Sequence, residues 1–215
     1  MTATRTLLLF GDSNTHGTIP MADLSDDGRF DRQERWAGRL QRLLPDWEVI
    51  AEGHPGRTTL HDDPVEGPHR NGLRVLPALL ESHRPLDAVL IMLGTNDLKE
   101  RFSVNAGDIA LSVERLVAEI RASGAGPAGG VPGILIVCPP PIEEVGCLAE
   151  IFAGGAAKSH RLAARMEEMA ARNGLPFLDA GTLVRVSPVD GIHYDADANP
   201  VLAEAFASAI RRHFP

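Results

Sequence analysis

Short apolar runs alternate along the chain with longer stretches in which apolar residues recur every three or four positions. Runs of the first kind, or segments that alternate like a strand, are typical of buried β-strands and cover residues 7–10, 47–51, 88–93, 134–138 and 177–180. Stretches of the second kind predict amphipathic helices over residues 35–44, 73–82, 108–121, 160–171 and 201–212. Pro77 is a weak point in the second of these helices, because proline removes a helical hydrogen bond.

Strands that alternate with helices along a chain build a parallel sheet with helices on both of its faces. Right-handed crossovers leave few arrangements of such units. We therefore predict a three-layer α/β/α, flavodoxin-like fold with a five-stranded parallel sheet, in a single domain that spans residues 1–215. Residues 142–155 contain apolar residues and glycines without a clean period, and we expect them to form a lid or an intersubunit loop.

The overall charge and the length of the apolar runs narrow the classes of partner. A net charge of -8 argues against nucleic acid or an anionic membrane surface as a partner. No apolar run approaches the length of a membrane span, and the segment Met1 to Thr6 lacks the layout of a signal peptide. The two cysteines, Cys138 and Cys147, are too few for a disulfide framework or a zinc site. We expect a cytoplasmic protein with two free thiols.

Small polar residues or glycines follow four of the predicted strands. Ser13 comes directly after the first strand, Gly56 after the second and Asn96 after the third. Asp190 and His193 lie in a loop after the fifth strand. Because the carboxyl ends of parallel strands meet at one edge of the sheet, where open α/β sheets bind their ligands, we expect these loops to share one crevice.

Three of these residues have complementary chemistry. A serine hydroxyl is a weak nucleophile until an adjacent base takes its proton. His193 is a suitable base, since the ordinary pKa of histidine lies close to neutrality. Asp190 lies three residues before His193, close enough to fix the imidazole tautomer across a tight turn. The pattern favours Ser13 as nucleophile, His193 as base and Asp190 as the residue that orients the base.

Attack on an ester carbonyl places negative charge on oxygen, and waiting hydrogen-bond donors stabilise it by roughly 3–4 kcal/mol each. Gly56 offers a backbone N–H without a side chain to obstruct the approach. Asn96 offers a side-chain amide, and the backbone N–H of Ser13 is a third candidate. We expect these three residues to form an oxyanion hole.

The chain resembles the SGNH (GDSL-type) hydrolase superfamily in four blocks, which agree in order and spacing over nearly its whole length: Gly11-Asp12-Ser13, Gly56, Gly94-Thr95-Asn96-Asp97 and Asp190-Gly191-Ile192-His193. The segments 47–63, 85–97 and 188–193 resemble bacterial arylesterases, carbohydrate acetylesterases and acyltransferases of that superfamily. The resemblance implies a carboxylic ester hydrolase that needs no cofactor and acts on a small ester. It implies the same catalytic and oxyanion residues, and a homo-oligomer whose loops complete the pocket.

Two positions depart from the pattern of these relatives. Asn14 stands where many relatives have leucine, and His16 stands where arylesterases of this branch often carry tryptophan. With Asp12, these residues are our candidates for substrate binding. Their polarity leads to the hypothesis that a short polar acyl ester, such as an acetylated sugar, suits the site better than a long aliphatic chain.

Three other functions remain open at this stage. The same acyl-enzyme could pass its acyl group to an alcohol or a peroxide, which would make the protein an acyltransferase or perhydrolase. A hydrolytic metal site would draw its ligands from residues 61–63 and from Asp190, His193, Asp195 and Asp197. The spacing matches no zinc signature and leaves Ser13 unexplained, so we predict no metal. A non-catalytic sugar-binding module on the same fold would not need a nucleophile and a base.

Overall fold

One parallel sheet lies at the centre of the computed structural model, which describes residues 4–215, so that Met1 to Ala3 lie outside the described residues. Within this range the sheet has five strands in the order β2-β1-β3-β4-β5, and every neighbouring pair is parallel. This order confirms the predicted flavodoxin-like fold. The strands are β1 (Arg5–Gly11), β2 (Trp47–Gly53), β3 (Ala88–Met92), β4 (Gly133–Cys138) and β5 (Phe177–Asp179).

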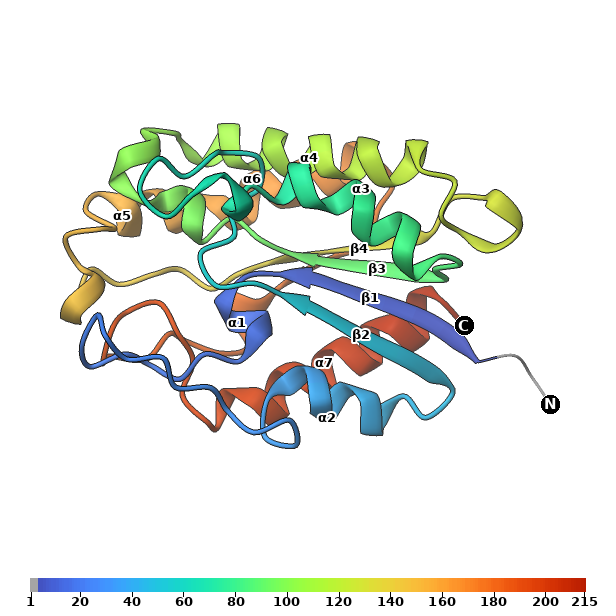
Figure 1. Ribbon diagram of the computed structural model, residues 1–215, viewed down its shortest axis with the longest axis horizontal. Coiled ribbons are helices and arrows are strands. Elements are labelled where there is room, and N and C mark those ends of the chain that lie inside the picture. The colour runs from blue at the N-terminus through green and yellow to red at the C-terminus, as the bar shows by residue number, and fades with distance from the viewer. Residues whose placement is uncertain (1–3) are drawn as a thin grey trace.

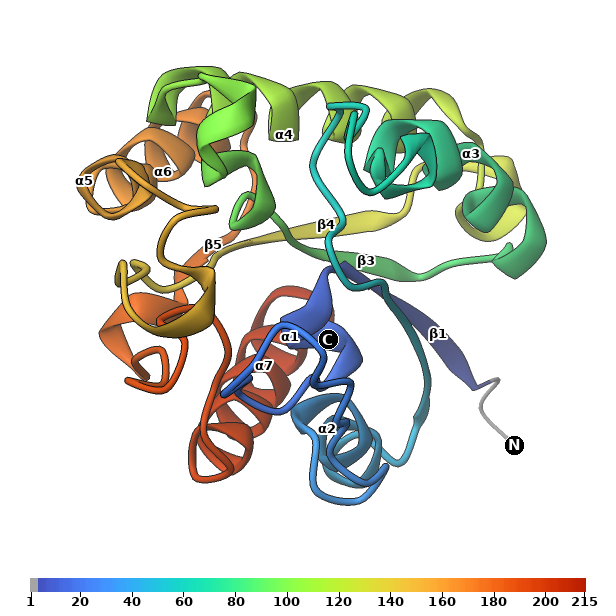
Figure 2. The same ribbon diagram turned by 60° about the vertical axis from the view of Figure 1, so that its left-hand side comes forward.

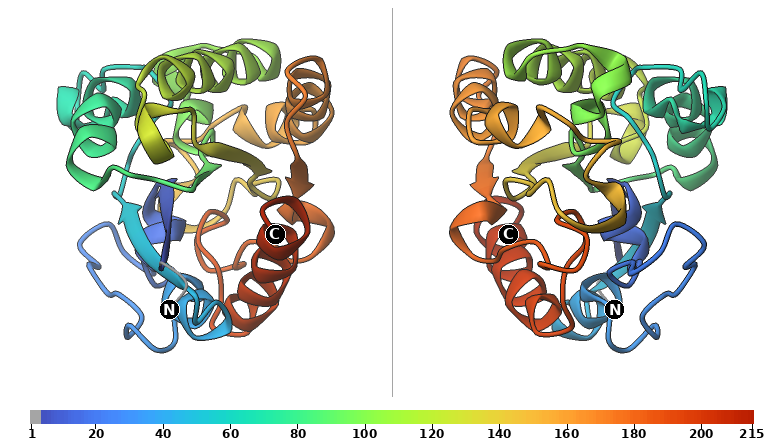
Figure 3. Two further views of the ribbon diagram at one scale, coloured as in Figure 1. Left: turned by 90° about the vertical axis from the view of Figure 1, so that its right-hand side faces the viewer. Right: turned by 90° about the vertical axis from the view of Figure 1, so that its left-hand side faces the viewer.

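Helices cover both faces of the sheet and complete the three layers (Figures 1 and 3). One face is covered by α3 (Gly72–His83), α4 (Ala106–Ala122) and α6 (Leu162–Arg172). The other face is covered by α2 (Trp36–Leu43) and α7 (Ala198–His213). Two short helices, α1 (Ser13–His16) and α5 (Gly155–Ser159), lie in the connections.

The side chains of β1 show why the sheet has two hydrophobic cores. Leu8 and Phe10 pack in the core under α3 and α4, and Leu7 and Leu9 pack in the core under α2 and α7. All four side chains are fully buried. Successive residues of a strand point to opposite faces, so a strand that is covered on both faces must be apolar throughout.

Pro77 lies inside α3 without ending it, although the sequence predicts a weak point there. A proline in a helix interior costs about 3 kcal/mol. Leu76 and Leu80 of the same helix are fully buried, and each contributes about 1.5–3 kcal/mol. Packing on the sheet therefore outweighs the lost hydrogen bond.

The carboxyl ends of the strands meet at one edge of the sheet, where α1 and several long loops gather (Figure 2). Residues 142–155, which have no clean period, contain only a short 3-10 turn at Gly146–Leu148 before α5 begins. Between residues 4 and 215 no helix is long and apolar enough to cross a membrane.

Candidate active site

Ser13 is the first residue of α1 and comes two residues after the end of β1. The turn between them is tight, because a Cβ atom on Gly11 would lie 2.0 Å from Thr15 Oγ1. Asp12 caps the helix, since its Oδ1 accepts a hydrogen bond of 3.0 Å from the N–H of Asn14. This local geometry holds Ser13 at the carboxyl edge of the sheet.

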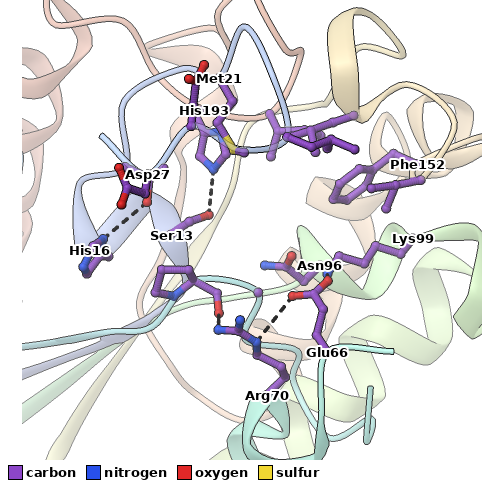
Figure 4. Close-up of a pocket in the computed structure, with 18 residues that line it drawn as sticks. Ser13, His16, Met21, Asp27, Glu66, Arg70, Asn96, Lys99, Phe152 and His193 are labelled. Atoms are coloured by element: carbon purple, nitrogen blue, oxygen red, sulfur yellow. Dashed lines mark hydrogen bonds and ion pairs between the residues drawn. The ribbon is translucent and has the colours of Figure 1, made fainter. Parts of the chain in front are cut away.

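His193 lies between Ser13 and Asp190. Its Nε2 is 3.0 Å from Ser13 Oγ, and its Nδ1 is 2.6 Å from Asp190 Oδ2. Figure 4 shows the Ser13 hydroxyl directed at the imidazole. The structure thus brings together three residues that are up to 180 positions apart in the sequence.

Asp190 is fully buried and accepts hydrogen bonds through both oxygens. Its Oδ1 accepts from the N–H groups of Ile192 and His193, each at 3.0 Å, and its Oδ2 also accepts from the N–H of Met21 at 2.8 Å. Burial by itself raises the pKa of Asp190, but the hydrogen bonds and the charge of His193 outweigh it and lower this pKa. The ionised carboxylate places the imidazole proton on Nδ1, which leaves Nε2 free to accept from Ser13.

Gly56 and Asn96 line the same cavity as Ser13 and His193. Gly56 has a φ of 73°, and a Cβ atom there would lie 2.5 Å from Glu66 Oε2, so the position requires glycine. The Asn96 amide nitrogen is 3.5 Å from Asp12 Oδ2. The three residues that we predict for the oxyanion hole therefore meet around one cavity.

Comparison with known proteins assigns the chain to a family. Residues 9–201 match the GDSL-like Lipase/Acylhydrolase family. The chain is 40% identical to the native aryl esterase of M. smegmatis, and the two structures align with a TM-score of 0.92 over 98% of this chain and 100% of that chain. This chain belongs to the GDSL-like lipase/acylhydrolase family. It is a carboxylic ester hydrolase.

Further comparisons agree with this assignment. The esterase is 36% identical to a carbohydrate acetylesterase from Sinorhizobium meliloti, with a TM-score of 0.91 over 98% of this chain and 100% of that chain. A lipase/acylhydrolase from Enterococcus faecalis shares 19% identity and a TM-score of 0.67 over 97% of this chain and 96% of that chain, which shows the common fold alone. None of the curated proteins matches the chain.

The cavity of the esterase has a volume of about 480 Å³ and two kinds of wall. Its apolar lining residues are Met21, Leu24, Leu148, Ile151, Phe152 and Ile192. Its charged lining residues include Glu66, Arg70 and Lys99. Figure 4 shows Glu66 and Arg70 on the Asn96 side of the cavity and Met21 next to His193. A bound ester would therefore meet both an apolar surface and a charged one.

Residues 142–155 form part of the apolar wall, through Leu148, Ile151 and Phe152. Two glycines allow this segment to pack directly on the turn that carries Asp190. A Cβ atom on Gly191 would lie 1.9 Å from the Glu143 carbonyl oxygen, and one on Gly146 would lie 2.0 Å from the Val189 carbonyl oxygen. The segment with no clean period is thus held against the candidate catalytic turn.

The charged wall was not predicted from the sequence. Lys99 is only 4% exposed, and its Nζ pairs with Glu66 and, at 3.5 Å, with Asp63. Arg101 pairs with the same two carboxylates, at 3.1 Å and 3.5 Å. Lys99 follows Asn96 by three residues, which is the one signal that could have suggested a place near the site. Nothing in the local pattern indicates that Glu66, 33 residues earlier, is its partner.

The three candidates for substrate binding have different surroundings. His16 lines the cavity, and burial together with the charges of Arg29 and Arg35 lowers its pKa to about 4, so it is neutral at pH 7. Asn14 is 4% exposed and donates its amide N–H to the Ile192 carbonyl at 3.1 Å. Neither Asn14 nor Asp12 is among the residues that line the cavity. The Asn14 amide therefore forms its hydrogen bond inside the protein and does not make the mouth of the site more polar.

Two other predictions concern the cysteines and a metal site. Cys138 and Cys147 are both free thiols. Over the part of the chain that the structure describes, no group of three or more His, Cys, Asp or Glu side chains is arranged to hold a metal ion.

The pKa of Asp12 predicts an effect of pH on stability. Burial raises this pKa from 3.8 to about 6, against the lowering effects of the Asn14 N–H and of the His193 and Arg57 charges. Between these two values the folded protein binds more protons than the unfolded chain, so its stability falls as the pH rises. The decrease in unfolding free energy over this range is at most about 3 kcal/mol, and we expect Asp12→Asn to abolish it.

The measurement is urea unfolding of the wild type and the variant at several values from about pH 4 to about pH 8. The informative quantity is the difference in unfolding free energy between the two proteins, because any pH-independent effect of the substitution cancels in its pH dependence. Asp46→Asn is the control, since Asp46 is exposed. A difference that stays constant across the pH range would contradict the raised pKa of Asp12.

Proposed function

We propose that this esterase hydrolyses short-chain acyl esters, such as acetylated sugars or aryl acetates, through an acyl-enzyme on Ser13. The observation that carries the proposal is the continuous hydrogen-bonded series at the cavity. Ser13 Oγ lies 3.0 Å from His193 Nε2, and Asp190 Oδ2 lies 2.6 Å from His193 Nδ1. A nucleophile, a base and an orienting carboxylate in this order are the components of serine esterase chemistry.

The reaction has two steps in this scheme. His193 Nε2 takes the proton of Ser13 Oγ while that oxygen attacks the ester carbonyl carbon. The oxyanion accepts hydrogen bonds from the N–H groups of Ser13 and Gly56 and from the Asn96 amide. His193 then gives its proton to the leaving alcohol, and the acyl group remains on Ser13. His193 takes a proton from water, which attacks the acyl carbon. The bond from that carbon to Ser13 Oγ then breaks, His193 returns the proton to Oγ, and the acid is released.

The charged wall supports a short acyl group. Glu66 and Arg70, whose side chains are 30% and 21% exposed, line the cavity, and a long aliphatic chain that covered them would remove charges from water at a cost in free energy. A small acyl group leaves them solvated, and the hydroxyl groups of a sugar can hydrogen-bond to them. The chain is similar to an aryl esterase and to a carbohydrate acetylesterase, and these names indicate aryl esters and acetylated carbohydrates as their substrates.

A chain-length series tests this proposal. We expect kcat/KM to be at least about tenfold higher for p-nitrophenyl acetate than for p-nitrophenyl octanoate, a difference of about 1.4 kcal/mol in transition-state binding. Release of acetate from an acetylated monosaccharide, followed in parallel, reports on the sugar substrate. The hydrolysis that remains with Ser13→Ala gives the background for each ester. A preference for octanoate over acetate would contradict the proposal.

The homo-oligomer and the cytoplasmic location stay predictions from the sequence. So does the choice of acyl acceptor, because an alcohol could replace water in the second step.

A further inference from the structure

Asp97 joins the loop after β2 to the loop after β3. Its carboxylate accepts hydrogen bonds from the Thr59 N–H, at 3.1 Å and 3.0 Å to its two oxygens, and from the Thr59 hydroxyl at 2.5 Å. His61 Nδ1 lies 2.9 Å from Asp97 Oδ1 and donates a further hydrogen bond. Asp97 is fully buried, so these bonds are protected from competition with water.

The two loops carry the two candidate oxyanion donors outside α1. Gly56 precedes Thr59 by three residues, and Asn96 is the residue directly before Asp97. Strands β2 and β3 are not neighbours, because β1 lies between them in the sheet. Adjacent strands are about 4.8 Å apart, so the two loops begin roughly 10 Å from each other. No backbone ladder sets the distance between these loops, and the Asp97 carboxylate supplies a direct link.

We infer, on the basis of the proposed function, that Asp97 and His61 are positioning residues that hold the Gly56 N–H and the Asn96 amide at the spacing an oxyanion requires. Neither residue is among those that line the cavity, so both act through the donors. Donors must be in place before charge develops on the oxygen, because their value in catalysis comes from preorganisation.

His61 is built to support this link. Its side chain is 22% exposed, and its ring lies 5.5 Å from the ring of Phe102. The hydrogen bond with Asp97 raises the pKa of His61, against the effect of partial burial. Nδ1 donates to Asp97 in both the charged form and the Nδ1–H neutral form, so the bond persists on either side of this pKa.

Asp97→Asn gives the main test. Asparagine removes the negative charge, and because all partners of Asp97 are donors, its amide nitrogen at either oxygen position faces the Thr59 N–H instead of accepting from it. We expect kcat for p-nitrophenyl acetate to fall by about 10–100-fold while KM changes by less than about threefold, because the lost interaction acts in the transition state. Titration with a fluorophosphonate counts the functional sites, so that kcat is expressed per labelled Ser13.

A double-mutant cycle shows whether the effect passes through the oxyanion donors. In an Asn96→Ala background we expect Asp97→Asn to cost at least about threefold less than in the wild type, since one of the donors that it positions is already absent. An equal cost in both backgrounds, or an unchanged kcat per labelled site, would overturn the inference.

His61 provides a second test if Asp97→Asn does not fold. We expect His61→Leu to lower kcat by about tenfold, and His61→Asn, whose amide can donate from near the Nδ1 position, to recover most of this loss. His83→Leu is the control, because His83 also pairs with a carboxylate, at 3.1 Å from Glu52, but Glu52 lies within β2 and not in a loop that carries an oxyanion donor. Equal activity of the two His61 variants would contradict the positioning role.

The activity of Ser13→Ala distinguishes failure of the proposed serine mechanism from failure of the positioning role of Asp97 and His61. If Ser13→Ala retains activity, the proposed function itself fails. If Ser13→Ala is inactive and the Asp97 and His61 variants keep the wild-type kcat, the serine mechanism stands and only the positioning role is wrong.

Discussion

Replacement of Ser13 by alanine is expected to lower kcat for p-nitrophenyl acetate by at least about 10⁴-fold. Ser13 Oγ is 3.0 Å from His193 Nε2, the atom that takes its proton in the proposed mechanism. Alanine removes the attacking oxygen and leaves only the hydrogen-bond donors of the cavity to act on a bound ester. We expect KM to change little, since the hydroxyl contributes to chemistry more than to binding.

Labelling with a fluorophosphonate, followed by mass spectrometry of the digested protein, locates the reactive side chain. We expect the label on Ser13 in the wild type and its absence in Ser13→Ala. Ser112→Ala is the matched control, because Ser112 is also a buried serine, and its hydroxyl donates to the Asp108 carbonyl within α4. An active Ser13→Ala variant, or a label on another residue, would show that Ser13 is not the nucleophile.

Replacement of Asp190 by asparagine is expected to lower kcat by about 10⁴-fold. Four donors converge on this carboxylate: His193 Nδ1 and the N–H groups of Met21, Ile192 and His193. An asparagine amide that faces His193 donates to Nδ1 and therefore moves the imidazole proton to Nε2. In this tautomer Nε2 cannot accept the proton of Ser13.

Asp195→Asn is the control for this substitution, because Asp195 is an exposed carboxylate of the same loop that accepts from the Ser187 hydroxyl at 2.9 Å. The steady-state kcat and the melting temperature are measured for both variants, so that loss of the fold is separated from loss of the base. A well-folded Asp190→Asn variant that keeps kcat within about tenfold of the wild type would contradict the orienting role.

The local pattern predicts most of the fold, because each strand and helix leaves its own period in the sequence. The continuous run 88–93 indicates a strand covered on both faces, and β3 occupies Ala88–Met92 with every residue buried. Helix α5 is different. It has five residues, which is too short for a helical period to stand out from its surroundings. Its place could be decided only by packing.

The sequence predicts that the candidate catalytic residues lie close together, and the reason is the topology of the sheet. The carboxyl ends of parallel strands share one edge, so loops that follow different strands meet whatever their separation in sequence. Ser13, Gly56, Asn96 and His193 accordingly line one cavity, and Asp190 lies behind His193. This inference needs only the order of strands and the position of each polar residue after its strand.

The direction of a side chain and its long-range partners, in contrast, could not be predicted from the order of the strands. Asn14 and His16 are two residues apart on α1, yet His16 lines the cavity and Asn14 bonds to Ile192. The Met21 N–H reaches Asp190 across 169 residues, and Asp97 meets Thr59 across 38.

The sequence by itself therefore determined the layers, the order of the elements and the edge at which the chemistry gathers, because these follow from local periodicity and from the geometry of a parallel sheet. Only the tertiary structure decided which neighbouring loops exchange hydrogen bonds, which residue of a helical turn faces the cavity, and which charges pair inside its wall. These features depend on the packing of segments that are distant in the chain, and a local sequence pattern does not indicate which distant residue will be in contact.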